Sequence, residues 1–236
     1  MKKQFSIFQL IFFVVLLLTI IILYVSRVDN RITQEDVEFI TNHFINLDAG
    51  DPYSKSYEKQ LDLIKSIQHS VFIVAPTHNR IDKRNAREPK DLYLNKGGIC
   101  NDRSRVIEKI LRYYGFKTRH IALYSTGETD SNLKSILTPG IPSHALTEVL
   151  TSKGWLVVDS NEEWVAIDKN NHPISISEII RNKNSVIGRL KNEFPFPIYV
   201  NDFFAIYGLY SRHGMYYPPY NFIPDINYSE FLDNFI

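Results

Sequence analysis

The chain has 236 residues, a formal net charge of +1, seven histidines and one cysteine. Nothing in this charge balance points to nucleic acid, so we expect no nucleic-acid partner. A single cysteine excludes an intramolecular disulfide and a cysteine-rich metal site. The fold must therefore depend on a hydrophobic core, for which 44% hydrophobic residues are an ordinary supply.

A long apolar segment lies at the N-terminus, at about residues 5–25, and it contains no charged residue. A helix of this length, at about 1.5 Å per residue, spans a hydrocarbon layer of roughly 30 Å. A cleaved signal peptide has a shorter apolar region and small residues at its cleavage site, which this segment lacks. We predict that residues 1–27 are a single-pass signal anchor. The alternative is a buried core helix.

The charges that flank this segment favour one orientation only slightly. Lys2, Lys3 and the terminal amine precede it, whereas Arg27 and Arg31 follow it with Asp29 between them. On the positive-inside rule this places the N-terminus in the cytoplasm. We therefore predict a soluble domain on the extracytoplasmic side, periplasmic or extracellular.

Residues 28–90 are predicted to be the helical N-terminal part of the domain. Residues 33–47 have Thr33 as a possible N-cap and Asp36 at a capping-box position. Residues 56–72 carry apolar side chains at near-helical spacing. Both segments are therefore expected to form helices.

Cys100 is predicted to lie at or just before the first turn of the next helix. Before it, residues 77–91 are charged and interrupted by Pro89, which indicates a long surface loop. Gly115 is a natural C-terminal stop for the helix. The side chains that mark its single buried face are Val106, Ile107, Ile110, Leu111 and Tyr114.

Three strands are expected after this helix, and they complete a predicted core at residues 91–165. Residues 118–125 form the first strand, and residues 127–143 form a loop rich in glycine and proline. Residues 144–160 contain two strands joined by a tight turn near residues 152–154. The fold class is thus α+β, with a helix packed on an antiparallel sheet.

The last hairpin brings a histidine and an aspartate onto one face of the sheet. His144 and Asp159 lie directly opposite each other if the turn is centred between Thr151 and Ser152. They are diagonal neighbours on the same face if it is centred between Ser152 and Lys153. A turn centred on a single residue would place them on opposite faces.

These residues suit nucleophilic catalysis by a thiol. A helix N-terminus favours the thiolate of Cys100, and Gly97 and Gly98 would let the backbone turn sharply and a substrate approach closely. Asp159 can hold one nitrogen of His144, which leaves the other for the thiol. The alternative for Cys100 is a small buried hydrophobic side chain.

The C-terminal extension, residues 166–236, is rich in Phe and Tyr towards its end. We predict that it packs on the core, with its aromatic rings filling gaps. The alternative is that these rings form an aromatic wall of a substrate cleft.

Three stretches in order resemble the transglutaminase-like superfamily, as in a membrane-anchored member of bacterial type. They are GGICNDRSRVIEKILRYYGFKTRHIAL, SHALTEVL and GWLVVDS, and the resemblance covers roughly residues 61–159. The matching features are Gly98-Ile99-Cys100 opening a helix, Gly115 and Arg119 leading into a strand, His144 starting the next strand, and Trp155 to Asp159 closing the last.

The resemblance implies a papain-like fold whose nucleophile helix packs on an antiparallel sheet. It also implies acyl transfer through a thioester, with Cys100 as nucleophile, His144 as general base and then acid, and Asp159 orienting His144. The backbone N–H of Cys100 would be one oxyanion donor, and Asn95 and Asn101 are weak candidates for the second. No cofactor and no metal are expected.

The expected function is that of a cysteine hydrolase or protease acting on an amide in an envelope protein or peptide. Crosslinking is the less favoured outcome, because an amine would have to outcompete water. One alternative is a non-catalytic binding module on the same fold. A weaker one is a role with envelope polysaccharide, because aromatic side chains stack on sugars.

Overall fold

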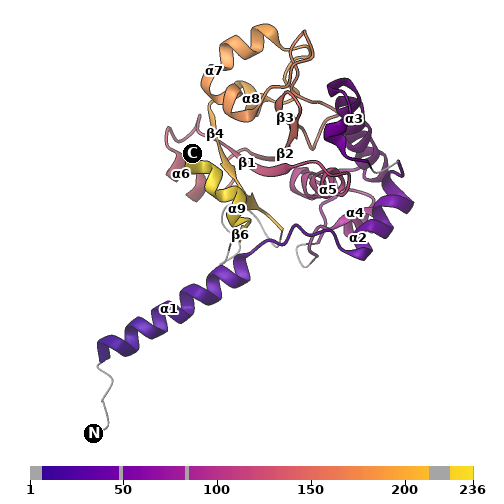
Figure 1. Cartoon of the computed structure of the whole chain (residues 1–236). Helices are drawn as coiled ribbons and strands as arrows, with labels where there is room; N and C mark the ends of the chain where they lie inside the picture. Colours follow the sequence, from indigo (N-terminus) through magenta and orange to yellow (C-terminus); the bar gives the residue numbers. More distant parts are fainter. Residues whose placement is uncertain (1–6, 48–49, 83–84, 213–223, 236) are drawn as a thin grey trace.

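A computed structural model describes residues 7–47, 50–82, 85–212 and 224–235 of the chain. Its centre is a four-stranded antiparallel sheet in the order β3-β2-β1-β4 (Figure 1). The strands are β1 (Thr118–Ser125), β2 (Ser143–Thr151), β3 (Gly154–Val158) and β4 (Phe203–Tyr207). The predicted α+β class with an antiparallel sheet is confirmed.

Helices cover both faces of this sheet, and each face has its own hydrophobic core. In the first core, α3 (Tyr57–Val74) and α5 (Cys100–Tyr113) pack against Val149 of β2. In the second core, α7 (Ile176–Arg189) and α8 (Pro197–Val200) pack against Leu146 of the same strand. Because alternate side chains of a strand point to opposite faces, β2 serves both cores.

Shorter elements connect these layers. They are α2 (Gln34–Phe39) with a π-helical turn at Ile40–Phe44, a 3₁₀ turn at Pro52–Ser54, α4 (Pro89–Asn95), α6 (Asn132–Leu137), the paired β5 (Leu209–Tyr210) and β6 (Asp225–Ile226), α9 (Tyr228–Phe231) and a 3₁₀ turn at Leu232–Phe235. The capping box predicted at the start of α2 is present, since Thr33 and Asp36 exchange hydrogen bonds of 3.1 and 2.8 Å.

The N-terminal helix α1 (Ile7–Ser26) projects away from the domain (Figure 1). It is long and apolar enough to cross a membrane, and none of its apolar window is buried. The alternative of a buried core helix is therefore wrong. The chain meets the domain directly after α1, because the Ser26 hydroxyl lies 2.5 Å from that of Tyr228 and the Val28 N–H donates to the Ile226 carbonyl at 2.9 Å.

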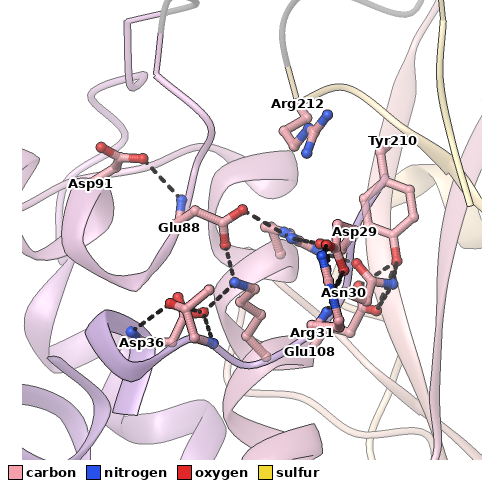
Figure 2. Close-up of polar contacts among 12 residues, drawn as sticks. Asp29, Asn30, Arg31, Asp36, Glu88, Asp91, Glu108, Tyr210 and Arg212 are labelled. Carbon is pink, nitrogen blue, oxygen red and sulfur yellow. Dashed lines mark hydrogen bonds and ion pairs between the residues drawn. The ribbon is translucent and has the colours of Figure 1, made fainter. Parts of the chain in front are cut away.

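Helix α5 is buried on all sides, not on one face only. The predicted apolar face is buried as expected, but every residue from Asn101 to Leu111 is buried as well. Arg105 pairs with Glu88 at 2.9 Å, and Lys109 pairs with Asp36 at 2.6 Å and with Glu88 at 2.7 Å; Figure 2 labels these two acids. Arg112 pairs with Glu230 at 2.7 Å, whereas Arg103 donates to the carbonyls of Ala75 and Thr77, both at 2.9 Å. The predicted single buried face was thus incomplete, since the polar face is also covered.

The segment before α4 differs from the predicted surface loop. Ile81 and Arg87 are buried, and both bind the carboxylate of Asp102 in the first turn of α5. The Arg87 Nε donates to Oδ1 at 2.6 Å and the Ile81 N–H donates to Oδ2 at 3.2 Å. A buried carboxylate needs such partners, so these two residues of the loop point inward, whereas residues 77–80, 82 and 85 are exposed as predicted. Pro89 does not break a helix here but starts α4, where proline is favoured.

The buried carboxyl group of Glu230, close to Glu108 and Arg112, predicts that stability depends on pH. Burial, followed by the negative charge of Glu108, raises the pKa of Glu230 from its ordinary 4.5 to about 8, against the lowering effect of Arg112. The folded protein then binds a proton that the unfolded chain has released between pH 4.5 and 8. The free energy of unfolding is therefore expected to fall as pH rises through this window.

Urea unfolding of the full chain in detergent at pH 5 and pH 8.5 measures this effect. Glu230→Gln should remove more than about 1 kcal/mol of the difference between the two pH values. The exposed Glu38 is the control position, and Glu38→Gln should leave the difference unchanged. The same slope in Glu230→Gln as in the wild type would contradict the assignment to Glu230.

Candidate active site

Cys100 is the first residue of α5 and is partly exposed to solvent. The preceding residue, Ile99, has an extended backbone, and its N–H donates to Oδ2 of Asp102 at 3.0 Å. The same carboxylate therefore caps α5 and ties down the buried loop before α4. The first N–H groups of a helix have no intrahelical acceptor, so those at Cys100 can face an anion.

The two glycines before Cys100 allow close packing. Gly97 forms a parallel bridge with Thr77, and the Gly98 N–H donates to the Thr77 carbonyl at 2.9 Å. A Cβ atom on Gly97 would overlap Thr77 Oγ1, and one on Gly98 would lie 2.7 Å from Leu92 Cδ1. Neither glycine has a positive φ, so the predicted sharp turn is not the reason for them.

The hairpin of β2 and β3 brings His144 and Asp159 together. Its register pairs Thr147 with Val158 and Thr151 with Gly154, which centres the turn between Ser152 and Lys153. This is the second of the two turn positions considered from the sequence. His144 and Asp159 share a face, and Nε2 of the histidine lies 2.8 Å from Oδ2 of the aspartate.

The carboxylate of Asp159 is fully buried and accepts hydrogen bonds at both oxygens. Its Oδ1 accepts from the backbone N–H groups of Asn161 and Glu162 at 2.7 and 2.9 Å. Its Oδ2 accepts from His144 and from the hydroxyl of Tyr199, which lies at 2.5 Å. The side chain of Asp159 is therefore fixed from several directions.

A glutamine that the sequence analysis did not single out holds the chain after Asp159. Gln68 of α3 is buried, and its Nε2 donates to the carbonyls of Asp159, Glu162 and Trp164 at 2.8, 3.1 and 2.9 Å. The signal in the sequence is a polar residue on the apolar face of the helix, four positions after Ile64. Such a residue is expected to find hydrogen-bond partners inside the protein.

The electrostatics of the pair favour an ion pair between His144 and Asp159. Burial lowers the pKa of His144, but the charge of Asp159, its hydrogen bond and the contact with Cys100 raise it to about 10. Burial raises the pKa of Asp159, yet His144, Tyr199 and the Asn161 N–H lower it overall. With Nε2 facing Asp159, Nδ1 of His144 is the nitrogen left for Cys100.

Neither predicted side-chain oxyanion donor is free. The Asn95 amide donates to the carbonyls of Asn79 and Gly97, both at 2.8 Å. The Asn101 amide is buried and donates to the carbonyl and hydroxyl of Ser211 at 3.3 Å. Both amides hold backbone in place, so the N–H of Cys100 is the remaining donor among the three candidates.

Aromatic rings from the C-terminal extension cover His144. Phe196 lies 5.4 Å from its ring and Tyr199 lies edge-on at 6.0 Å, so His144 is only 4% exposed. Tyr199 in turn packs against Trp164 and Phe194 at 5.5 and 5.3 Å between ring centroids. Phe196 and Tyr199 of the predicted extension thus contact His144, whereas the packing of the extension as a whole stays a prediction. The later tyrosines of the tail, in residues 213–223, lie outside the described residues.

Within the described residues, no group of three or more His, Cys, Asp or Glu side chains is arranged to hold a metal ion. Residues 46–160 match the family model of the transglutaminase-like superfamily. The chain carries a transglutaminase-like domain. The matched residues include Cys100, His144 and Asp159, whereas α7, α8 and β4 follow the match. A search of curated proteins gave no match to the chain.

Proposed function

We propose that this protein is a membrane-anchored cysteine enzyme that transfers an acyl group through a thioester on Cys100. Hydrolysis of an amide in an envelope protein or peptide is the reaction that fits best. The observation that carries this proposal is the buried ion pair of His144 and Asp159, 2.8 Å long, beside a cysteine at the start of a helix. This arrangement supplies a nucleophile, a proton carrier and an orienting carboxylate.

The steps follow from these positions. The Cys100 thiolate attacks the amide carbonyl carbon, and the carbonyl oxygen becomes an oxyanion beside the Cys100 N–H. The intermediate collapses and the C–N bond breaks, while the imidazolium of His144 gives its proton to the leaving amine. Neutral His144 then takes a proton from water, which attacks the thioester. Breakage of the C–S bond releases a carboxylic acid and regenerates the thiolate–imidazolium pair.

One feature supports hydrolysis over crosslinking, and another supports a location at the membrane. Cys100 is partly exposed, so water has access to a thioester formed there. Helix α1 is suited to a bilayer, with the domain on the extracytoplasmic side as the flanking charges favour.

The second candidate is a binding module without catalysis, with an envelope polysaccharide as one ligand class. The near-complete burial of His144 favours it, because a substrate must reach this group.

A substrate screen with an amine competitor tests the proposal. The detergent-solubilised full chain is incubated with a library of glutamine-containing peptides and a biotinylated primary amine, and products are read by mass spectrometry. We expect cleaved or deamidated peptides in excess over amine adducts, and none of these products with Cys100→Ser.

Dominant amine adducts would overturn hydrolysis in favour of crosslinking. The absence of any product that depends on Cys100, together with a thiol no more reactive than free cysteine, would favour the binding module.

A further inference from the structure

Helix α8 carries a tyrosine to the buried carboxylate of the candidate site. Tyr199 lies 40 positions after Asp159 in sequence and beyond the residues that match the family model. Its side chain is fully buried, and its hydroxyl lies 2.5 Å from Oδ2 of Asp159. The C-terminal extension therefore contributes a direct hydrogen bond to the pair at the centre of the site.

The oxygen that Tyr199 contacts is the one that holds His144. Oδ2 of Asp159 accepts from His144 Nε2 at 2.8 Å and from the Tyr199 hydroxyl at the same time. Burial and the charge of Asp159 raise the pKa of Tyr199 well above its ordinary value, so the hydroxyl stays protonated and donates. A second donor stabilises negative charge on Oδ2 and so weakens its attraction for the histidine proton.

We propose that Tyr199 is a positioning residue of this site, whose hydroxyl shares Oδ2 of Asp159 with His144 and limits how strongly Asp159 holds the imidazolium. The proposal rests on the proposed function for its catalytic meaning. The interaction itself is measurable without a substrate.

Packing alone does not account for this hydroxyl. The ring of Tyr199 stacks on Phe194 with an interplanar angle of 14°, and phenylalanine would keep that contact. Tyr57 shows the contrast, because its buried hydroxyl has no hydrogen-bond partner. A buried tyrosine hydroxyl in this protein is thus not always directed at a partner, whereas that of Tyr199 meets the one carboxylate that binds His144.

The test is the pH dependence of Cys100 alkylation in the full chain in detergent micelles. Iodoacetate is an anion, so its rate falls at high pH when His144 loses its positive charge. With the single cysteine of this chain, intact mass reports one site. Tyr199→Phe removes a hydrogen-bond donor to Asp159. We therefore expect the upper limb of the profile, which is the fall in alkylation rate at high pH, to move to higher pH by about one unit.

Tyr57→Phe is the matched control and should leave the limb in place. An unchanged limb in a folded Tyr199→Phe variant would overturn the proposal. A shift of equal size when Tyr199→Phe is added to Asp159→Asn would also overturn it, because the hydroxyl is proposed to act through the Asp159 carboxylate.

Two further measurements apply if the variant does not fold or if Cys100 does not react with iodoacetate. If Tyr199→Phe does not fold, 3-fluorotyrosine at position 199 keeps the shape with a stronger donor, and the limb should move to lower pH. If Cys100 does not react, ¹⁵N NMR of labelled histidine gives the titration of His144 directly, with His144→Gln for assignment. The same His144 titration in the wild type and in Tyr199→Phe would refute the role of Tyr199, independently of whether the protein proves to be an enzyme.

Discussion

Replacing His144 by alanine is expected to lower the rate at which iodoacetate alkylates Cys100 at pH 6 by about a hundredfold. The reason is the ion pair: Asp159 and Cys100 outweigh burial and raise the pKa of His144 to about 10, so the imidazolium is present at pH 6. A neighbouring imidazolium stabilises a thiolate in general, whereas a free thiol is less than about 1% thiolate at this pH.

The control for this experiment is another histidine that contacts a carboxylate. His69 lies 2.7 Å from Glu163, but both side chains are more than half exposed. His69→Ala should leave the alkylation rate within about twofold of the wild type. The reason is that solvent screens the exposed His69–Glu163 pair, so this pair contributes little. Neutral iodoacetamide should show a smaller loss in His144→Ala than iodoacetate does. Equal rates for wild type and His144→Ala would mean that Cys100 is not activated.

Replacing Lys109 by alanine is expected to lower the free energy of unfolding by about 3–5 kcal/mol. The amine of Lys109 contacts Asp36 at 2.6 Å and Glu88 at 2.7 Å, and the lysine and Asp36 side chains are almost fully buried (Figure 2). Without the amine, the buried carboxylate of Asp36 loses its ion-pair partner, whereas Glu88, which is 23% exposed, keeps its contact with Arg105. The loss therefore includes the cost of unpaired buried charge, which greatly exceeds that of a lost surface contact.

Lys90 provides the matched comparison on the same part of the molecule. It contacts Glu35 at 2.7 Å, but the two side chains are 44% and 57% exposed. Lys90→Ala should therefore cost less than about 1 kcal/mol. Urea unfolding of the full chain in detergent measures both variants. A loss for Lys109→Ala no larger than that for Lys90→Ala would show that the cluster is hydrated in solution.

The sequence was informative where the pattern is local. Helix α5 was predictable because its apolar spacing is regular, its first turn lies at Cys100 within the predicted limits, and Gly115 has the positive φ of a helix stop. The β2–β3 hairpin followed from a glycine turn between two apolar runs. The contact of His144 with Asp159 depends only on that turn, so it was predictable once the register was limited to two choices.

Features that depend on distant parts of the chain were not predictable in this way. Strand β4 pairs with β1 about 80 residues away, and its run of Phe, Ala, Ile and Tyr does not alternate between polar and apolar. Tyr199 is one of 14 tyrosines in the chain, and only tertiary packing brings its hydroxyl to Asp159. The polar face of α5 reads as a solvated surface, because periodicity alone cannot show which acids return to cover it.

The junction after α1 has a mechanical consequence. The chain is tied to the domain within two residues of the end of α1, through Ser26 to Tyr228 and Val28 to Ile226. With α1 in a bilayer as proposed, no flexible linker separates the domain from the membrane. The domain therefore stays close to the lipid surface and its orientation is restricted. Its working height above the lipid is set by the fold, so its substrates would be those that present an amide at that height.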